Sequence, residues 1–147
     1  MNIEWDDLYS LGNERIDQQH KELFQLAGVV MTAEDQAGYR IAAILLYKHL
    51  RVHFADEEAL MREVKYPSVQ EHCQIHLGMV TRLNEISKTI GQGEWDKAAI
   101  ASFMTEWVAV HIMQEDYKVA CHIRQLAENP VAQDPTSHLT RRLQALL

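Results

Sequence analysis

Apolar side chains recur at intervals of three and four residues along most of this chain, the period that places them on one face of an α-helix. In the first such segment the apolar face ends with Val30 and Met31, and in the second it includes Leu45. Four helices are predicted in this way, over residues 17–35, 39–64, 68–90 and 94–127. The breaks between them contain glycine, proline or short polar runs, which interrupt helices. No alternation typical of strands competes with this pattern.

Four helices of this length with short connections predict an all-α fold, an antiparallel up-down-up-down four-helix bundle. An N-terminal arm, residues 1–16, should be non-helical, with Trp5, Leu8 and Leu11 lying across a helix surface. Asp17 is the expected N-cap of the first helix. Beyond the bundle domain, residues 1–130, a C-terminal tail over residues 131–147 shows a short amphipathic helix pattern through Leu139, Leu143 and Leu146.

Composition narrows the function classes. The chain has 147 residues, the length of one domain, and a formal net charge of -7, which argues against nucleic acid as a partner. No apolar run has the length of a membrane span, and no signal peptide is visible. The two cysteines are too few for a disulfide framework and fit a reducing compartment. We therefore expect a cytoplasmic protein with no nucleic-acid or membrane partner.

Histidines stand on the predicted inner face of every helix. These are His20, His53, His72, His76 and His111. A single histidine on an apolar face is usually a hydrogen-bonded core residue. Five imidazoles buried together would each need a partner and would repel one another if protonated. A metal centre satisfies all of them at once, so the set predicts one.

The spacing of these residues suits chelation. His72 and His76 are four residues apart, as are His53 and Glu57, so each pair shares a helix face. On the fourth helix His111 is followed by both Glu115 and Asp116. An ideal helix places the residue at i+4 about 40° from residue i but the residue at i+5 about 140° away. Geometry alone favours the glutamate.

Four motifs in order carry a resemblance to a known family. They are IDQQHKELF (16–24), HFADEEALM (53–61), YPSVQEHCQIH (66–76) and HIMQED (111–116). This set resembles the hemerythrin family, and more closely its bacterial branch. The resemblance implies a bundle that holds a non-haem di-iron centre, with two iron ions that cycle between Fe²⁺ and Fe³⁺, a bridging oxo or hydroxo group, and O2 as the ligand.

The resemblance also implies a ligand set. His72, His76 and His111 would bind one iron, His20 and His53 would bind the other, and Glu57 and Asp116 would bridge them. This choice of Asp116 over Glu115 requires a wide turn in the fourth helix, such as a π-bulge. Coordination arithmetic leaves one open position, on the iron with two histidines. A dry pocket around that position would come from nearby apolar residues, and the candidates are Leu23, Phe24, Trp107 and Ile112.

The leading functional hypothesis is reversible O2 binding for O2 storage and delivery or for O2 or redox sensing, and not enzymatic turnover. The amphipathic tail favours sensing slightly, because such pieces lead into signalling output domains in bacterial relatives. A tail that packs on the bundle, or one that forms a homodimer, is the alternative. A redox enzyme with oxidase, peroxide or nitric oxide chemistry at the same centre is the alternative, and a zinc or mixed-metal structural site is a third. His49, where bacterial relatives commonly have an aromatic residue, either hydrogen-bonds behind a ligand, alters access to the centre or packs one layer above it. Asp56 and Glu58 are expected to be exposed, and His122 to be solvated.

Overall fold

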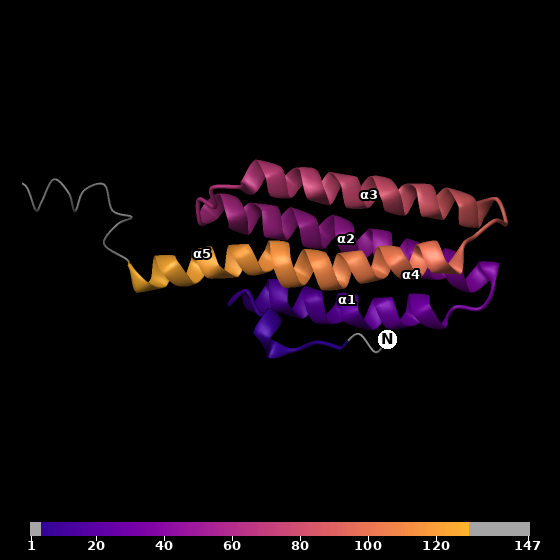
Figure 1. Ribbon diagram of the computed structural model, residues 1–147, viewed down its shortest axis with the longest axis horizontal. Helices are drawn as coiled ribbons and strands as arrows, with labels where there is room; N and C mark the ends of the chain where they lie inside the picture. The colour runs from indigo at the N-terminus through magenta and orange to yellow at the C-terminus, as the bar shows by residue number, and fades with distance from the viewer. Residues whose placement is uncertain (1–3, 130–147) are drawn as a thin grey trace, which may run out of the picture.

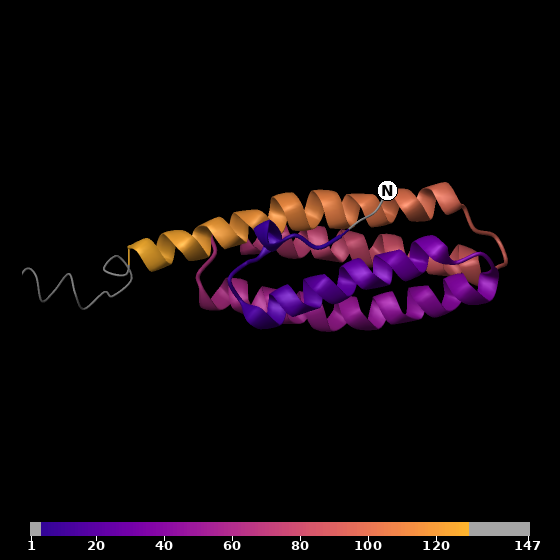
Figure 2. The same ribbon diagram turned by 90° about the horizontal axis from the view of Figure 1, so that it is seen from below.

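The computed structural model describes residues 4–129, which form four long helical rods in an antiparallel bundle (Figure 1). A 3₁₀ turn, η1 (Asp7–Tyr9), precedes α1 (Glu14–Thr32), α2 (Gln36–Glu63) and α3 (Val69–Gly91). The fourth rod consists of α4 (Lys97–Thr105), η2 (Glu106–Asp116) and α5 (Tyr117–Glu128) in direct succession. The predicted all-α four-helix bundle is confirmed, and α5 extends past the other rods at one end (Figure 2).

The first helix starts earlier than predicted because Asn13, not Asp17, is its N-cap. The Asn13 side chain accepts a hydrogen bond from the Ile16 backbone N–H. Asp17 instead accepts from the Ser10 hydroxyl at 2.6 Å and from the Leu11 backbone N–H at 2.7 Å, so it stabilises the turn before the helix. At the other end of α1 the chain leaves the helix at Thr32, and Asp35 caps α2. The expected bounds of 17–35 were therefore wrong by three residues at each end.

The fourth rod contains the wide turn that the spacing of His111 and Asp116 predicted. Its middle section, η2, is π-helical over 11 residues, Glu106–Asp116. A π-helix has i→i+5 hydrogen bonds and therefore more residues per turn than an α-helix. Residues five apart thus approach the same face. The prediction anticipated a single local bulge, and the structure extends the widened geometry over the whole segment.

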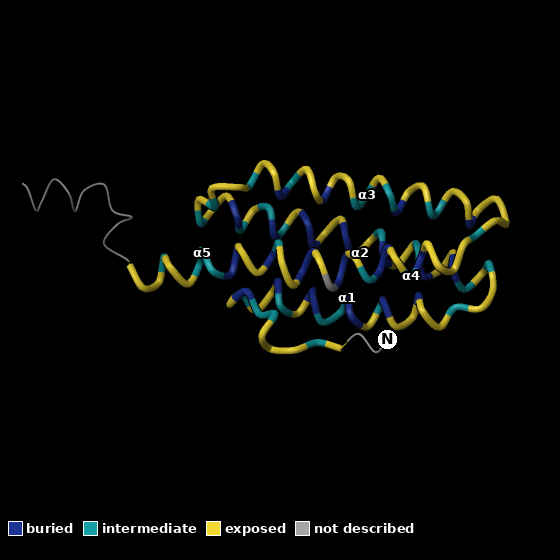
Figure 3. The backbone as a smooth tube through the Cα atoms, viewed as in Figure 1, coloured by how far each residue is buried: buried dark blue, intermediate teal, exposed yellow. Residues whose placement is uncertain are grey.

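Buried polar residues separate two apolar clusters inside the bundle. The larger cluster includes Leu23, Phe54 and Ile112, and the smaller one includes Ile16, Met61 and Val119. Along α1, α2 and the fourth rod, the buried side chains pass from one cluster to the other through histidines and carboxylates. The inward faces of the helices are buried and their outward faces exposed (Figure 3). The apolar scaffold therefore holds a polar layer at a fixed depth.

Some predicted inner positions lie outside the core. Met31 and Leu45 are 45% and 43% exposed, because the helical face that packs inward is narrower than the apolar pattern suggested. In the N-terminal segment Leu11 is buried and Trp5 packs edge-on against Phe24, as predicted, but Leu8 is 75% exposed. The predicted tail, residues 131–147, lies outside the described residues. Among residues 4–129, no helix has the length and apolarity to cross a membrane.

Candidate metal centre

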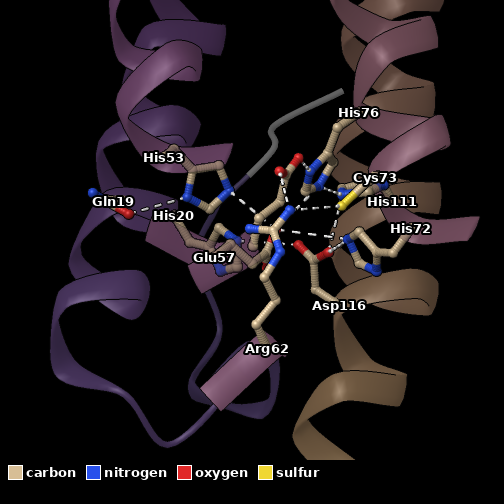
Figure 4. Close-up of polar contacts among 11 residues, drawn as sticks. Gln19, His20, His53, Glu57, Arg62, His72, Cys73, His76, His111 and Asp116 are labelled. Atoms are coloured by element: carbon tan, nitrogen blue, oxygen red, sulfur yellow. Dashed lines mark hydrogen bonds and ion pairs between the residues drawn. The ribbon is translucent and has the colours of Figure 1, made fainter. Parts of the chain in front are cut away.

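The four rods bring seven predicted residues together in the polar layer between the two apolar clusters (Figure 4). They are His20 on α1, His53 and Glu57 on α2, His72 and His76 on α3, and His111 and Asp116 on η2. None of these side chains is more than 3% exposed. Glu115, which the ideal-helix argument favoured, lies outside this layer and pairs with Lys118 at 2.8 Å.

The seven residues form two groups that share their carboxylates. In one group, ligand atoms of Glu57, His72, His76, His111 and Asp116 all lie within 4.8 Å of one another. In the other, the same holds for His20, His53, Glu57 and Asp116. We call these the five-residue position and the four-residue position. Each has the size of a metal coordination sphere, and the two positions are unequal.

The shared aspartate has the orientation of a bridging ligand. Its Oδ1 atom lies 3.0 Å from His111 Nε2 and 3.2 Å from His72 Nε2, whereas its Oδ2 atom lies 3.1 Å from His20 Nε2. One oxygen of Asp116 thus faces each position. Glu57 does not turn one oxygen to each position as Asp116 does. A single oxygen, Oε2, lies near Nε2 of His76, at 3.1 Å, and near Nε2 of His53, at 3.9 Å.

The buried polar atoms of this layer fit a metal better than they fit one another. Within residues 4–129, neither oxygen of Glu57 or of Asp116 has a hydrogen-bond partner, and the same holds for His20 Nε2, His53 Nε2 and His72 Nε2. His76 Nε2 and His111 Nε2 lie 3.1 Å apart, a contact that two lone pairs cannot make without a proton or a cation between them. Buried polar groups without partners are costly. Imidazole and carboxylate donors aimed at common points suit iron or zinc.

Burial and mutual charge shift the titration of the cluster in the metal-free protein. Burial and the Asp116 charge would raise the pKa of Glu57, but the attraction of the nearby His72 and His76 imidazoles outweighs them and lowers it to about 2. Burial would lower the pKa of His72, but its carboxylate partners Asp116 and Glu57 raise it to about 9. For His53 burial dominates over the attraction of Glu57 and lowers the pKa to about 3. Protons on some imidazoles thus balance the two buried carboxylates.

Two of the histidines are oriented by acceptors behind them. His53 donates from Nδ1 to Gln19 Oε1 at 3.2 Å, and His76 donates from Nδ1 to Glu58 Oε1 at 3.1 Å. With the proton on Nδ1, each Nε2 presents a lone pair to the layer. Gln19 in turn donates to Asp56 Oδ2 at 2.6 Å. Because a carboxylate only accepts, this contact fixes which end of the amide faces His53.

The sequence-based interpretation missed these acceptors. Asp56 and Glu58 were expected to be exposed, but their side chains are only 25% and 23% exposed and their carboxylates bind Gln19 and His76. The expectation was wrong because helical angle alone does not show how far a side chain can reach towards a neighbouring helix. Gln19 and Glu58 both stand within the quoted motifs, next to His20 and Glu57, and that adjacency was the available signal.

His49 acts between α1 and α2 and makes no hydrogen bond to the seven residues. Its Nε2 donates to the Gln19 backbone carbonyl at 3.0 Å, and its Nδ1 lies 3.5 Å from Glu22 Oε2. His49 therefore supports Gln19, the residue that orients His53. Of the three roles expected for His49, this contact is closest to a hydrogen bond behind a metal ligand. His122, expected to be solvated, is half-buried and donates to the Val64 carbonyl at 2.8 Å.

Aromatic and apolar side chains enclose the polar layer. Phe54 stacks on the His76 ring, with ring centroids 3.8 Å apart and planes 9° apart, and it also lies edge-on to His111. Trp5 lies 6.3 Å from the His20 ring. The four candidates for an O2 pocket, Leu23, Phe24, Trp107 and Ile112, are all buried in the larger apolar cluster. Their role around an open metal position stays a prediction.

Comparisons with known proteins agree with the fold and with the cluster. The family model described as the hemerythrin HHE cation binding domain matches residues 11–123. A bacteriohemerythrin from Campylobacter jejuni is 29% identical over 126 residues, covering 78% of this chain and 90% of that protein. Myohemerythrins from Riftia pachyptila and Phascolopsis gouldii are 31% and 32% identical, each covering 78% of this chain and 88% of the relative. The chain therefore belongs to the hemerythrin family and matches its bacterial members.

Proposed function

We propose that this chain holds two iron ions in the polar layer and binds O2 reversibly at one of them. The observation that carries the proposal is the pair of ligand groups that share Glu57 and Asp116. Two positions with common carboxylates describe a bridged pair of ions, and a bridged pair is what the family resemblance implies. The buried oxygens and Nε2 atoms that lack hydrogen-bond partners among residues 4–129 support the proposal, because they are free to act as donors to such a pair.

In this proposal the ligands are the predicted ones. His72, His76 and His111 bind the iron at the five-residue position, and His20 and His53 bind the iron at the four-residue position. Glu57 and Asp116 bind both ions. When bound, the iron pair supplies the electrons with which O2 is held reversibly. The four-residue position has fewer protein donors, so it is the position with room for O2.

The chain's own residues set the conditions for binding without turnover. Five imidazoles, which would bind metal in their neutral form, and two carboxylates form the proposed donor set, which is poorer in negative charge than the four-carboxylate sets of di-iron oxidases. A donor set with little negative charge disfavours highly oxidised iron. The packed core around Leu23, Phe24, Trp107 and Ile112 excludes water, which would compete for the open position. We therefore propose a binder that serves O2 storage and delivery or sensing.

The test is an O2 titration of the iron-loaded, reduced protein under anaerobic conditions. We expect a visible spectrum that saturates with added O2 and returns to its starting form when O2 is removed under vacuum. Rapid oxidation of the iron that vacuum does not reverse would contradict reversible binding and favour the redox enzyme.

Unpaired Cys73 and Cys121 fit a reducing compartment, and a cytoplasmic location is proposed on that ground.

A further inference from the structure

The two metal positions differ in the charge of the group that stands behind a histidine. At the five-residue position, the acceptor behind His76 is the carboxylate of Glu58, at 3.1 Å. At the four-residue position, the acceptor behind His53 is the amide of Gln19, at 3.2 Å. The two contacts have the same donor atom, nearly the same length and equivalent places on their rings. Charge is the property that separates them.

Each acceptor is held in place by its own partners. The second oxygen of Glu58 accepts from Arg62 at 3.4 Å, and the same guanidinium lies 3.8 Å from Cys73 Sγ (Figure 4). Gln19 is held by Asp56, which also accepts from Arg15 at 2.8 Å. His49 binds the backbone carbonyl of Gln19. Neither acceptor is a loose surface side chain, so the difference in charge is built into the fold.

The physical effect of this difference follows from hydrogen bonding. A carboxylate that accepts the Nδ1 proton attracts it more strongly than an amide does, since charged acceptors form stronger hydrogen bonds. The imidazole then keeps more electron density and becomes a stronger donor through Nε2. A stronger donor stabilises Fe³⁺ relative to Fe²⁺ and lowers the reduction potential of the ion that it binds.

We infer that Glu58 and Gln19 are positioning residues that give the two irons different reduction potentials, with the five-residue position the more easily oxidised. This inference rests on the proposed di-iron function. It assigns the ready electron donor to the ion that has no place for O2. At the ion that receives O2, the acceptor behind His53 is an uncharged amide. Neither acceptor touches the metal positions, and each acts through one imidazole.

Two isosteric exchanges test the inference in opposite directions. Glu58→Gln removes the charge behind His76, and Gln19→Glu adds one behind His53. The midpoint potential of the iron-loaded protein, measured by spectroelectrochemical titration, should rise in the first variant and fall in the second. Replacing the hydrogen-bond acceptor of a metal-bound histidine typically changes metal affinity or activity by about tenfold or more. A tenfold shift in the Fe²⁺/Fe³⁺ equilibrium is ~59 mV for a one-electron step.

Glu115→Gln is the matched control for charge alone. Glu115 and Glu58 have almost equal side-chain exposure, 25% and 23%, but the Glu115 carboxylate pairs with Lys118 and not with a histidine ligand. Its replacement should move the potential much less than Glu58→Gln does. Equal shifts in these two variants, or potentials that stay unchanged in both exchanges, would overturn the inference. Thermal unfolding and iron content of each variant separate a shifted potential from a damaged fold.

A measurement without iron keeps this result separate from the proposed function. In the zinc-loaded protein, ¹⁵N-edited NMR detects the Nδ1 protons of His53 and His76 directly. The His76 proton should resonate further downfield, as expected for a carboxylate acceptor, and Glu58→Gln should move it upfield while His53 stays in place. Equal shifts for the two protons in the unaltered protein would overturn the inference itself. A protein that takes up no iron would instead overturn the proposed function on which the inference rests, even with the His76 proton downfield.

Discussion

Replacing Asp116 by asparagine tests which residue of the fourth rod bridges the two positions. Asp116 faces His20, His72 and His111 at 3.0–3.2 Å and belongs to both ligand groups, so the change weakens both positions together. Glu115→Gln is the matched control, because Glu115 is one residue away and pairs with Lys118 at the surface. Asp116→Asn should lose most of the bound iron, and Glu115→Gln should keep it.

The size of the effect follows from the ligand count. Loss of a group behind a ligand weakens metal binding by ~10–100-fold, so loss of a shared ligand should cost at least about 100-fold. At about 1.4 kcal/mol per tenfold, this reduces the stabilisation that iron gives to the fold by roughly 2.8 kcal/mol. For a domain of this size, one kcal/mol moves the Tm by ~2–4 °C. The rise in Tm on adding iron should thus shrink by ~5–11 °C in Asp116→Asn.

The assay is differential scanning calorimetry with and without Fe²⁺ under anaerobic conditions, together with iron quantification. The metal-free proteins provide the baseline, so a change in the apoprotein's own stability does not enter the comparison. A full iron-dependent rise in Tm for Asp116→Asn, together with its loss in Glu115→Gln, would refute the role of the π-helical turn in selecting the aspartate.

Three further predictions concern individual histidines. His76→Ala should lose most bound iron, whereas His122→Ala, which removes a histidine bound to a backbone carbonyl outside the layer, should keep it; iron retained at two ions per chain in His76→Ala would count against the ligand set. Carboxylates raise the pKa of His72 to about 9, so His72 is protonated at pH 7 and a binding metal ion must displace that proton; the affinity for metal should therefore increase as the pH rises towards 9. Calorimetry in buffers of different ionisation enthalpy should show proton release on metal binding, and binding heats that do not depend on the buffer would contradict this prediction. His49→Phe removes the hydrogen bond to the Gln19 carbonyl and should lower the free energy of unfolding by about 1 kcal/mol in urea titrations while iron content stays unchanged; a loss of iron would mean that His49 has a direct part in the site.

The sequence predicted the four helices because their apolar periodicity is a property of each segment alone. The first residue of α1 was harder to predict, because Asn13 and Asp17 are both good N-cap residues and local preference does not choose between them. The choice depends on the preceding turn, where the Asp17 carboxylate binds Ser10 and Leu11. The exposed positions of Met31 and Leu45 likewise depend on how neighbouring helices pack.

The approach of the seven polar residues could be anticipated because histidines occurred on every predicted inner face. The choice of Asp116 came from the family pattern, and ideal-helix geometry pointed to Glu115. The structure provides the missing reason, since the π-helical segment Glu106–Asp116 changes the angle between successive residues. The roles of Gln19 and Glu58 depend on contacts between helices, and no periodicity along one helix reveals them.

The most direct test of the central claim is the number and kind of metal ions that each chain holds. Protein produced in iron-replete cells and purified under anaerobic conditions should contain two iron ions per chain, one for each ligand group, by elemental mass spectrometry and quantitative protein assay. Mössbauer spectroscopy of the same sample should resolve two inequivalent iron sites. One ion per chain, zinc in place of iron, or a single class of iron would contradict a bridged pair of unequal positions.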